Sequence, residues 1–282
     1  MLGSFEGMTQ VPNIRLNNGV RIPQFGFGVF QVPPADTADA VREAFAAGYR
    51  HIDTAQGYNN EAGVGAAIKD SGLPRDEVFV TTKLNNQGHG YDSAIAGLER
   101  SLTELGLEHV DLYLIHWPLP HLDRFVETWK GFEKVLADGK ARSIGVSNFQ
   151  PEHLERLAKE TQTVPAVNQI ELHPKLTQQP LREYHAQHGI ATEAWSPIAK
   201  GEVLSAQTIT SLADKYGRTP AQIVLRWQVQ IGNIVFPKSV NPARMRENID
   251  VFDFELAADD VAEIEAMDAG YRTGPDPDTF GR

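Results

Sequence analysis

The chain of 282 residues contains no cysteine, no excess of basic residues and no long apolar run. Without cysteine it forms neither disulfides nor cysteine-ligated metal sites, and thiolate catalysis is excluded as well. A net charge of −11 argues against binding to nucleic acid or to an anionic membrane, because both bind basic surfaces. No stretch reaches the roughly 18 apolar residues that a transmembrane helix needs. These absences favour a cytoplasmic enzyme or binding protein.

The two ends of the chain differ from its middle. Residues 1–11 lack the basic and apolar regions of a signal peptide, and we interpret them as a leader in which Met8 is an alternative start. Residues 270–282 are rich in Pro, Gly and Asp and predict an irregular tail. A hydrophobic content of 41% indicates a sizeable core, and the length suits one barrel domain across residues 1–282.

The middle of the chain alternates between β-rich and helical segments. Asn18-Gly19 predicts a hairpin over residues 14–22. Eight strand candidates follow, separated by segments of helical period, and helices at 208–216 and 258–267 exceed the eight crossovers. Consecutive β-α units require parallel pairing and favour a closed (β/α)8 TIM barrel over an open doubly wound sheet. The predicted strands are residues 24–29, 50–54, 78–82, 111–116, 142–147, 166–170, 190–196 and 234–237.

Side chains suited to acid–base chemistry end consecutive predicted strands. Asp53, Lys83 and His116 stand at the carboxyl ends, and Tyr58 follows Asp53 in the loop. Each of the four alone is more often structural. Together they have a chemical logic, because an ammonium beside a phenol makes it a better acid than its free pKa of about 10. A carboxylate keeps a buried lysine charged, and a neutral imidazole donates a hydrogen bond to a carbonyl oxygen.

Such a site reduces a carbonyl only if a cofactor supplies hydride. A Rossmann phosphate loop is missing, because the glycine runs at 26–31 and 63–68 lack the third glycine; we interpret them as barrel and loop glycines. The segment 236–248 is a better anion site. Asn241 caps a helix there, and Lys238 and Arg244 add positive charge, although a solvated basic stripe remains the alternative. Trp195 is placed to stack on a nicotinamide ring, and Asn148 and Gln169 offer donors and acceptors for its carboxamide.

Several long motifs, in order, carry a family resemblance. They are GYRHIDTA at 48–55, DLYLIHWP at 111–118, IGVSNF at 144–149, NQIELHP at 168–174 and the segment 237–248. Through them, residues 12–268 closely resemble the aldo-keto reductases. Within that family the chain is most similar to the bacterial 2,5-diketo-D-gluconic acid reductases, through the short runs at 28–30 and 251–254.

The resemblance implies a monomer that reduces small aldehydes, ketones or diketones with NADPH and needs no metal. It implies that Tyr58 is the general acid, that Lys83 and Asp53 tune it, and that His116 positions the substrate carbonyl. Phe30, Trp117 and the tail are the implied walls of the substrate pocket. The residues expected to bind NADPH are Ser147, Asn148, Gln169, Trp195, Ser196, Lys238, Ser239, Val240, Arg244 and Asn248.

Three departures from the family pattern surround the catalytic residues. Gln56-Gly57 precedes the tyrosine, Asn59 replaces the usual glycine after it, and Leu84 follows the lysine where relatives often have tryptophan. We expect Gly57 to loosen the loop that carries Tyr58. An NADPH-binding regulatory or structural barrel without turnover is the alternative function. A metal-dependent hydrolase is less favoured, because the strand ends lack a cluster of His and carboxylate ligands.

Overall fold

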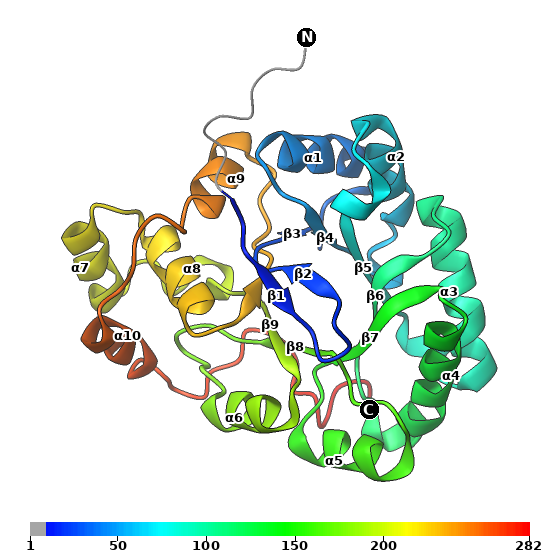
Figure 1. Cartoon of the computed structure of the whole chain (residues 1–282). Helices are drawn as coiled ribbons and strands as arrows, with labels where there is room; N and C mark the ends of the chain where they lie inside the picture. Colours follow the sequence, from blue (N-terminus) through cyan, green and yellow to red (C-terminus); the bar gives the residue numbers. More distant parts are fainter. Residues whose placement is uncertain (1–9) are drawn as a thin grey trace.

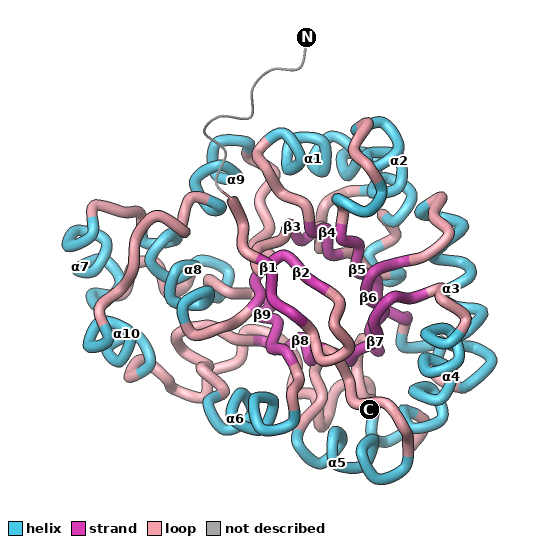
Figure 2. Tube along the Cα trace, in the orientation of Figure 1, coloured by secondary structure: helices cyan, strands magenta, loops and turns pink. Residues whose placement is uncertain are grey.

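The computed structural model describes residues 10–282, and in this part of the chain eight parallel strands curl into a barrel surrounded by helices (Figures 1 and 2). Neighbouring strands follow the chain order from β3 to β10, and a parallel bridge between Phe25 and Val235 joins the two edges. The predicted (β/α)8 barrel is therefore confirmed. The strands are β3 (Phe27–Gly28), β4 (His51–Asp53), β5 (Phe79–Leu84), β6 (Val110–Ile115), β7 (Ala141–Ser147), β8 (Val167–Glu171), β9 (Ala191–Trp195) and β10 (Ile234–Val235).

The helices cover the outside of the barrel. Each strand is followed by an α-helix, and α7 and α10 are the two that exceed this pattern, as predicted. The α-helices are α1 (Pro34–Ala46), α2 (Glu61–Ser71), α3 (Tyr91–Leu105), α4 (Phe125–Ala137), α5 (Pro151–Glu160), α6 (Gln179–His188), α7 (Gln207–Tyr216), α8 (Pro220–Gln230), α9 (Pro242–Ile249) and α10 (Ala258–Glu265). Short 3-10 turns are η1 (Gln56–Tyr58), η2 (Arg75–Glu77), η3 (Asn86–Gly88), η4 (Pro120–Leu122) and η5 (Ala199–Gly201).

Local sequence explains where these helices form. In α3, Leu98, Leu102 and Leu105 recur at helical spacing and are buried on one face. In α8, Thr219 and Gln222 form a reciprocal capping box, and Pro220 occupies the first turn. The apolar stripes of such helices pack on the outward side chains of the strands and make the main core.

A hairpin closes one end of the barrel (Figure 1). Its strands are β1 (Asn13–Arg15) and β2 (Arg21–Pro23), one residue displaced from the predicted ones, and Gly19 in the turn has a φ of +88°. Leu16 and Ile22 pack against Leu112, Leu114 and other inward side chains of the strands. The barrel interior is thus apolar at the hairpin end. Buried polar residues, described below, occupy the other end.

The two glycine runs serve packing rather than phosphate binding. A Cβ atom at Gly26 would lie 2.8 Å from the ring of His51, so this glycine makes room inside the barrel, as expected. Gly63 and Gly65 lie inside helix α2, so the expectation that they belong to a loop is wrong. A Cβ atom at Gly65 would lie 2.1 Å from the carbonyl oxygen of Leu105, which shows that α2 and α3 approach closely there.

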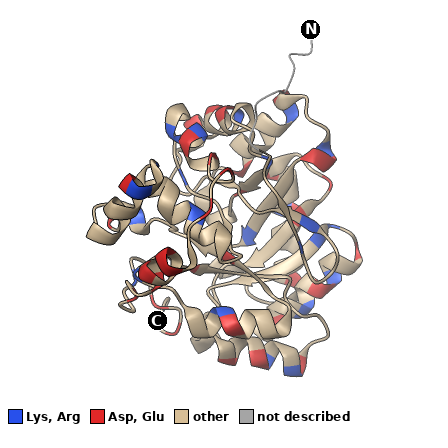
Figure 3. Cartoon of the chain, turned by 60° about the vertical axis from the view of Figure 1, so that its left-hand side comes forward, with Lys and Arg blue, Asp and Glu red and all other residues tan. Residues whose placement is uncertain are grey.

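The outer surface carries charges of both signs. In the view of Figure 3, the positions of acidic and basic residues are interspersed along the outer helices. No helix within residues 10–282 combines the length and the apolar character needed to cross a membrane. Residues 1–9, and with them the prediction about Met8, lie outside the described residues.

Candidate active site

Three of the four predicted catalytic residues meet at the ammonium group of Lys83. Its Nζ lies 2.6 Å from Oδ1 of Asp53 and 3.3 Å from the hydroxyl of Tyr58, and it also donates to the carbonyl of Thr54 at 2.9 Å. The three residues come from β4, β5 and the turn η1, whose ends converge at one mouth of the barrel. Lys83 is completely buried and Asp53 almost so. The close pair keeps a positive charge beside the phenol, away from water.

The fourth residue, His116, follows β6 at the same mouth. Its ring centroid lies 5.8 Å from that of Tyr58, at nearly a right angle. Burial, together with the charge of Lys83, lowers the pKa of His116 to about 3. The imidazole is therefore neutral at physiological pH and keeps one N–H donor for a carbonyl oxygen.

The acid–base state of Tyr58 corrects one expectation. Burial raises the pKa of Tyr58, and Asp53 raises it further, whereas the charge and hydrogen bond of Lys83 lower it; the net direction is upward. For Lys83, burial lowers the pKa, but Asp53 and Tyr58 raise it more. The phenol is thus not a better acid than free tyrosine in this state, because desolvation outweighs the ammonium. It holds its proton at neutral pH beside a lysine that stays charged.

The loop that carries Tyr58 is held by Gln56, one of the departures from the family pattern. The Nε2 of Gln56 donates to the carbonyl of Gly97 at 2.7 Å and to Oγ of Ser101 at 2.9 Å, both on α3. Its Oε1 accepts from the backbone N–H of Asn85 at 2.8 Å. The expectation that Gly57 loosens this loop therefore overlooked its neighbour, which anchors the loop at three points.

Asn59 and Asn60 complete the turn after Tyr58. Asn59 has a φ of +55°, a conformation that asparagine tolerates better than most residues. Asn60 accepts a hydrogen bond from the hydroxyl of Thr54 at 2.8 Å and donates to the carbonyl of Val29 at 2.9 Å. These bonds connect the turn to the residues that directly follow β3 and β4, so the phenol has a defined position.

Gln169, on β8, points toward the catalytic cluster. Its Nε2 donates to Oδ2 of Asp53 and to Oε2 of Glu193, each at 2.8 Å. Both amide hydrogens are used in this way, because each of the two oxygens accepts one of them. The Oε1 of Gln169 is left as an acceptor, which suits the amino group of a carboxamide.

Ser147, Asn148 and Trp195 form a connected set beside Gln169. The indole N–H of Trp195 donates to Oδ1 of Asn148 at 2.8 Å, and Nδ2 of Asn148 donates to the carbonyl of His116 at 3.0 Å. The hydroxyl of Ser147 donates to the carbonyl of Gln169 at 2.8 Å. Asn148 is thus held by protein partners, and one lone pair of its oxygen is left for a ligand. Ser196 follows with a φ of +49°.

The predicted adenosine segment surrounds the start of helix α9. Asn241 caps this helix by accepting from the backbone N–H groups of Ala243 and Arg244 at 2.9 and 3.2 Å. These two N–H groups were expected to attract an anion, but Asn241 already accepts from them. The side chains of the segment must therefore supply more of the attraction for an anion. Lys238 and Arg244 are exposed, and within residues 10–282 neither pairs with a carboxylate. Ser239 is half-buried, Val240 is 56% exposed and Asn248 is buried.

The C-terminal tail covers part of the barrel mouth. The ring of Phe280 lies 4.3 Å from that of Trp117, which in turn lies 6.5 Å from Trp195. A Cβ atom at Gly274 would lie 2.4 Å from the indole of Trp195, so the tail backbone rests on that ring. Phe30 is 54% exposed, with its ring 5.1 Å from that of Tyr58. Trp117 is thus buried beneath the tail, whereas Phe30 is exposed beside Tyr58.

Glu171, at the end of β8, attaches the tail to the barrel. Its Oε1 accepts from the backbone N–H and the hydroxyl of Thr273 at 2.5 and 2.7 Å, and its Oε2 accepts from the N–H of Gly274 at 3.2 Å. His173 contacts the same carboxylate at 3.0 Å. Neither Glu171 nor Glu193 was predicted as a site residue, although Glu193 lies inside the predicted strand 190–196 and Glu171 directly follows the predicted strand 166–170.

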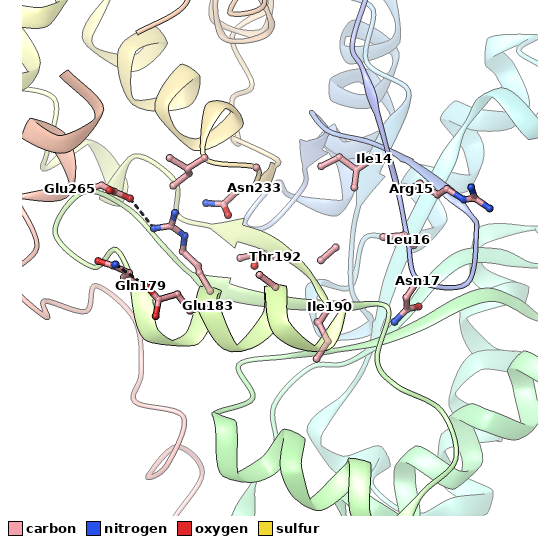
Figure 4. Close-up of a pocket in the computed structure, with 16 residues that line it drawn as sticks. Ile14, Arg15, Leu16, Asn17, Gln179, Glu183, Ile190, Thr192, Asn233 and Glu265 are labelled. Atoms are coloured by element: carbon pink, nitrogen blue, oxygen red, sulfur yellow. Dashed lines mark hydrogen bonds and ion pairs between the residues drawn. The ribbon is translucent and has the colours of Figure 1, made fainter. Parts of the chain in front are cut away.

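A separate cavity lies at the hairpin end, away from this cluster (Figure 4). Its volume is about 550 Å³, and the hairpin residues Ile14 and Leu16 face helix α6 across it. An ion pair of 3.1 Å joins Arg182 and Glu265 on its border. The cavity contains none of the predicted site residues. Within residues 10–282, no group of three or more His, Cys, Asp or Glu side chains is arranged to hold a metal ion.

Comparison with known proteins identifies the family. The sequence profile of the Aldo/keto reductase family matches residues 24–269. This range includes the barrel strands and the Tyr–Lys–Asp–His cluster at the barrel mouth. The chain is 55% identical over 269 residues to an aldo-keto reductase of Mycolicibacterium smegmatis, covering 95% of this chain and 98% of the relative. The chain belongs to the aldo/keto reductase family and is an oxidoreductase.

One further relative and one solved structure are also similar to this chain. The methylglyoxal reductase DkgA of Escherichia coli K12 is 49% identical over 270 residues, covering 95% of this chain and 98% of the relative. The crystal structure of a variant of Gox0644 in complex with NADPH superposes with a TM-score of 0.92 at 50% identity, covering 96% of this chain and 98% of that one.

Proposed function

We propose that the protein transfers a hydride from NADPH to the carbonyl carbon of a small aldehyde, ketone or diketone. The observation that carries the proposal is the contact of Lys83 with both Asp53 and Tyr58 at the barrel mouth, beside the neutral imidazole of His116. A phenol that keeps its proton next to a buried ammonium suits a general acid, because the ammonium stabilises the phenolate left behind.

Each of the four side chains has one task in this proposal. His116 donates a hydrogen bond to the substrate carbonyl and orients it toward Tyr58. Tyr58 gives its proton to the carbonyl oxygen as negative charge develops there. Lys83 stabilises the resulting phenolate, and Asp53 keeps Lys83 charged and in position at 2.6 Å. When bound, NADPH supplies the hydride.

The residues around the mouth fit such a cofactor. Gln169 presents Oε1 as an acceptor for the carboxamide, and Trp195 offers a flat indole held by Asn148. Ser147 and Ser196 lie beside them. The exposed cations Lys238 and Arg244, with Ser239, Val240 and Asn248 on the same segment, would hold the adenosine end and its 2′-phosphate.

The substrate class is a small dicarbonyl or a related aldehyde or keto-sugar. The Escherichia coli relative carries the name methylglyoxal reductase. Keto-sugars are included in the proposed class because the runs at 28–30 and 251–254 resemble those of the bacterial 2,5-diketo-D-gluconic acid reductases. Phe30 and Trp117 provide aromatic walls, and the tail limits the pocket on one side.

The test is to follow the absorbance of NADPH with a panel of aldehydes, α-diketones, keto-sugars and quinones, with NADH in parallel. Loss of NADPH absorbance with a carbonyl, at a rate well above that with NADH, would support the proposal. A protein that binds NADPH and reduces none of the panel would instead support the alternative of a regulatory or structural barrel. Quenching of tryptophan fluorescence by NADPH separates that case from a failure to bind.

We further propose a cytoplasmic monomer in which residues 1–282 form one domain. The acidic composition, which disfavours binding to nucleic acid or to anionic membranes, supports the cytoplasm. Size-exclusion chromatography with light scattering tests whether the protein is a monomer.

A further inference from the structure

Glu193 occupies the centre of β9, inside the barrel and behind the catalytic cluster. It stands in register with Gln169 on β8 and with Ile234 on β10. Its side chain is completely buried. The proposed reaction leaves this residue without a task, yet a fully buried glutamate is rare unless it is paired.

The contacts of Glu193 connect it to the cluster through one nitrogen atom. Its Oε2 accepts from Nε2 of Gln169 at 2.8 Å, and the same nitrogen donates to Oδ2 of Asp53 at 2.8 Å. The other oxygen of Asp53 accepts from Lys83. The Oε1 of Glu193 has no hydrogen-bond partner among residues 10–282. One amide therefore bridges two carboxyl groups, of which only Asp53 contacts the ammonium.

The charges around Glu193 leave it without a counterion of its own. Asp53 faces it from β4 and Lys83 from β5, while β8 and β10 contribute the neutral Gln169 and Ile234 in register. The imidazoles of His51 and His116 add no positive charge to the barrel interior, because burial lowers the pKa of His51 to about 4 and that of His116 to about 3. A buried carboxylate with an unpartnered oxygen is costly, whereas the protonated acid avoids the charge.

We propose that Glu193 is a positioning residue: a neutral carboxylic acid that holds the amide of Gln169 with its oxygen toward the mouth, and whose ionisation places a second negative charge behind Asp53. The role rests on the proposed reductase function. The pKa of Glu193 agrees with a neutral side chain, because burial and the charge of Asp53 raise it to about 8.

The consequence is a pH effect on the general acid. Above about pH 8, Glu193 loses its proton and adds negative charge near Lys83 and Tyr58. Negative charge stabilises the protonated forms of both, so Tyr58 becomes a weaker acid and carbonyl reduction slows. Below that pH the second charge is absent, and Asp53 alone balances Lys83.

The first experiment compares the pH profile of kcat for the wild type, E193Q and E193L with NADPH and methylglyoxal. E193Q keeps the acceptor for Gln169 but removes the charge, and E193L removes both. We expect kcat of the wild type to fall about tenfold between about pH 7 and about pH 9, and E193Q to stay nearly constant. E193L should also lose the alkaline fall and, in addition, should raise KM for NADPH. Identical profiles for wild type and E193Q, or an E193Q rate reduced equally at every pH, would overturn the proposal.

The second experiment measures thermal unfolding without substrate or cofactor. The folded-state pKa of Glu193 lies above its ordinary value of 4.5, so the wild type gains stability at low pH and loses it as pH rises from about 4.5 to about 8. E193Q lacks this dependence, and the difference in Tm between the two proteins should change by at least about 5 °C across that range. Parallel curves would show that Glu193 is already ionised and would overturn the proposal. The expected curves without turnover of any carbonyl would overturn the reductase function instead.

Discussion

The ammonium of Lys83 lies 2.6 Å from Oδ1 of Asp53, with 0% and 3% of the two side chains exposed to solvent. Breaking such a pair leaves a buried charge unpaired, which typically costs about 3–5 kcal/mol. Lys83→Met should therefore be less stable than the wild type by about that amount in urea unfolding. The double variant with Asp53→Asn should recover part of the loss, because no lone charge remains. Equal stability of Lys83→Met and the wild type would show that the ion pair makes no net contribution to the free energy of unfolding.

Tyr58→Phe removes the proposed proton donor and little else. Its hydroxyl contacts Lys83 at 3.3 Å, so we expect turnover to fall about 10² to 10⁴-fold while NADPH affinity stays within about threefold. Tyr113→Phe is the matched control, because its hydroxyl is also buried but bonds the carbonyl of Ala94 on the outer side of the barrel. Single-turnover kinetics compares the two. Turnover of Tyr58→Phe at the wild-type rate would refute the mechanism.

Arg244→Ala tests which cofactor the segment before and within α9 selects. A charge-assisted bond to a phosphate is worth about 1.5–3 kcal/mol, so Kd for NADPH should rise about 10- to 100-fold and Kd for NADH should hardly change. Fluorescence titration measures both. Arg246→Ala, an exposed arginine on the same helix, controls for the change in net charge. Equal weakening by both variants would point to general electrostatics rather than to a 2′-phosphate contact.

Glu171→Gln tests the attachment of the tail. The carboxylate accepts three hydrogen bonds from Thr273 and Gly274, and a glutamine would present an N–H to some of these donors. The tail should detach, and KM for the carbonyl should rise about tenfold or more, with a smaller change in kcat, because Phe280 no longer covers Trp117. Limited proteolysis followed by mass spectrometry should show faster cleavage near residue 273. An unchanged KM together with faster cleavage would show that the tail does not wall the pocket.

The attachment of the tail by Glu171 depends on pH, and the pKa shift of Glu171 sets the direction. Burial raises the pKa of Glu171, but hydrogen bonds from His173 and Thr273 lower it more, so the net direction is downward. The attachment is then fully present above the ordinary pKa of the group and is lost as pH falls through the lowered value. Proteolysis of the wild-type tail should accelerate only in acid, and Glu171→Gln should be cleaved at a rate independent of pH in that range.

Particular residues show which parts of the fold and the site could be predicted from the sequence. The strand and helix positions were predictable because their periodicity is local: Leu98, Leu102 and Leu105 mark one helix face wherever α3 finally packs. Asp53, Lys83 and His116 were predictable as neighbours, because parallel strands align their carboxyl ends. Gly63 and Gly65 were placed in a loop wrongly, since nothing local distinguishes a packing glycine in a helix from a loop glycine.

The pKa of Tyr58 could not be predicted from the residues alone. The ammonium beside Tyr58 was expected, but the amount of water excluded around it depends on the closed barrel, and that exclusion sets the net direction. Gln56 likewise anchors its loop through Gly97 and Ser101, more than forty positions away, and no motif records these partners.

The sequence by itself determined the element order, the barrel class and the identity of the groups at the strand ends, because these follow from short-range periodicity and from the alignment of parallel strands. The tertiary structure decided which of these groups are charged, which are bridged and which are covered. The amide of Gln169 reaches Asp53 across 116 positions of the chain, and the tail reaches Glu171 across 102. Such contacts exist only when the barrel closes and removes water, since burial and partner distance, not residue type, set the energy of a charge.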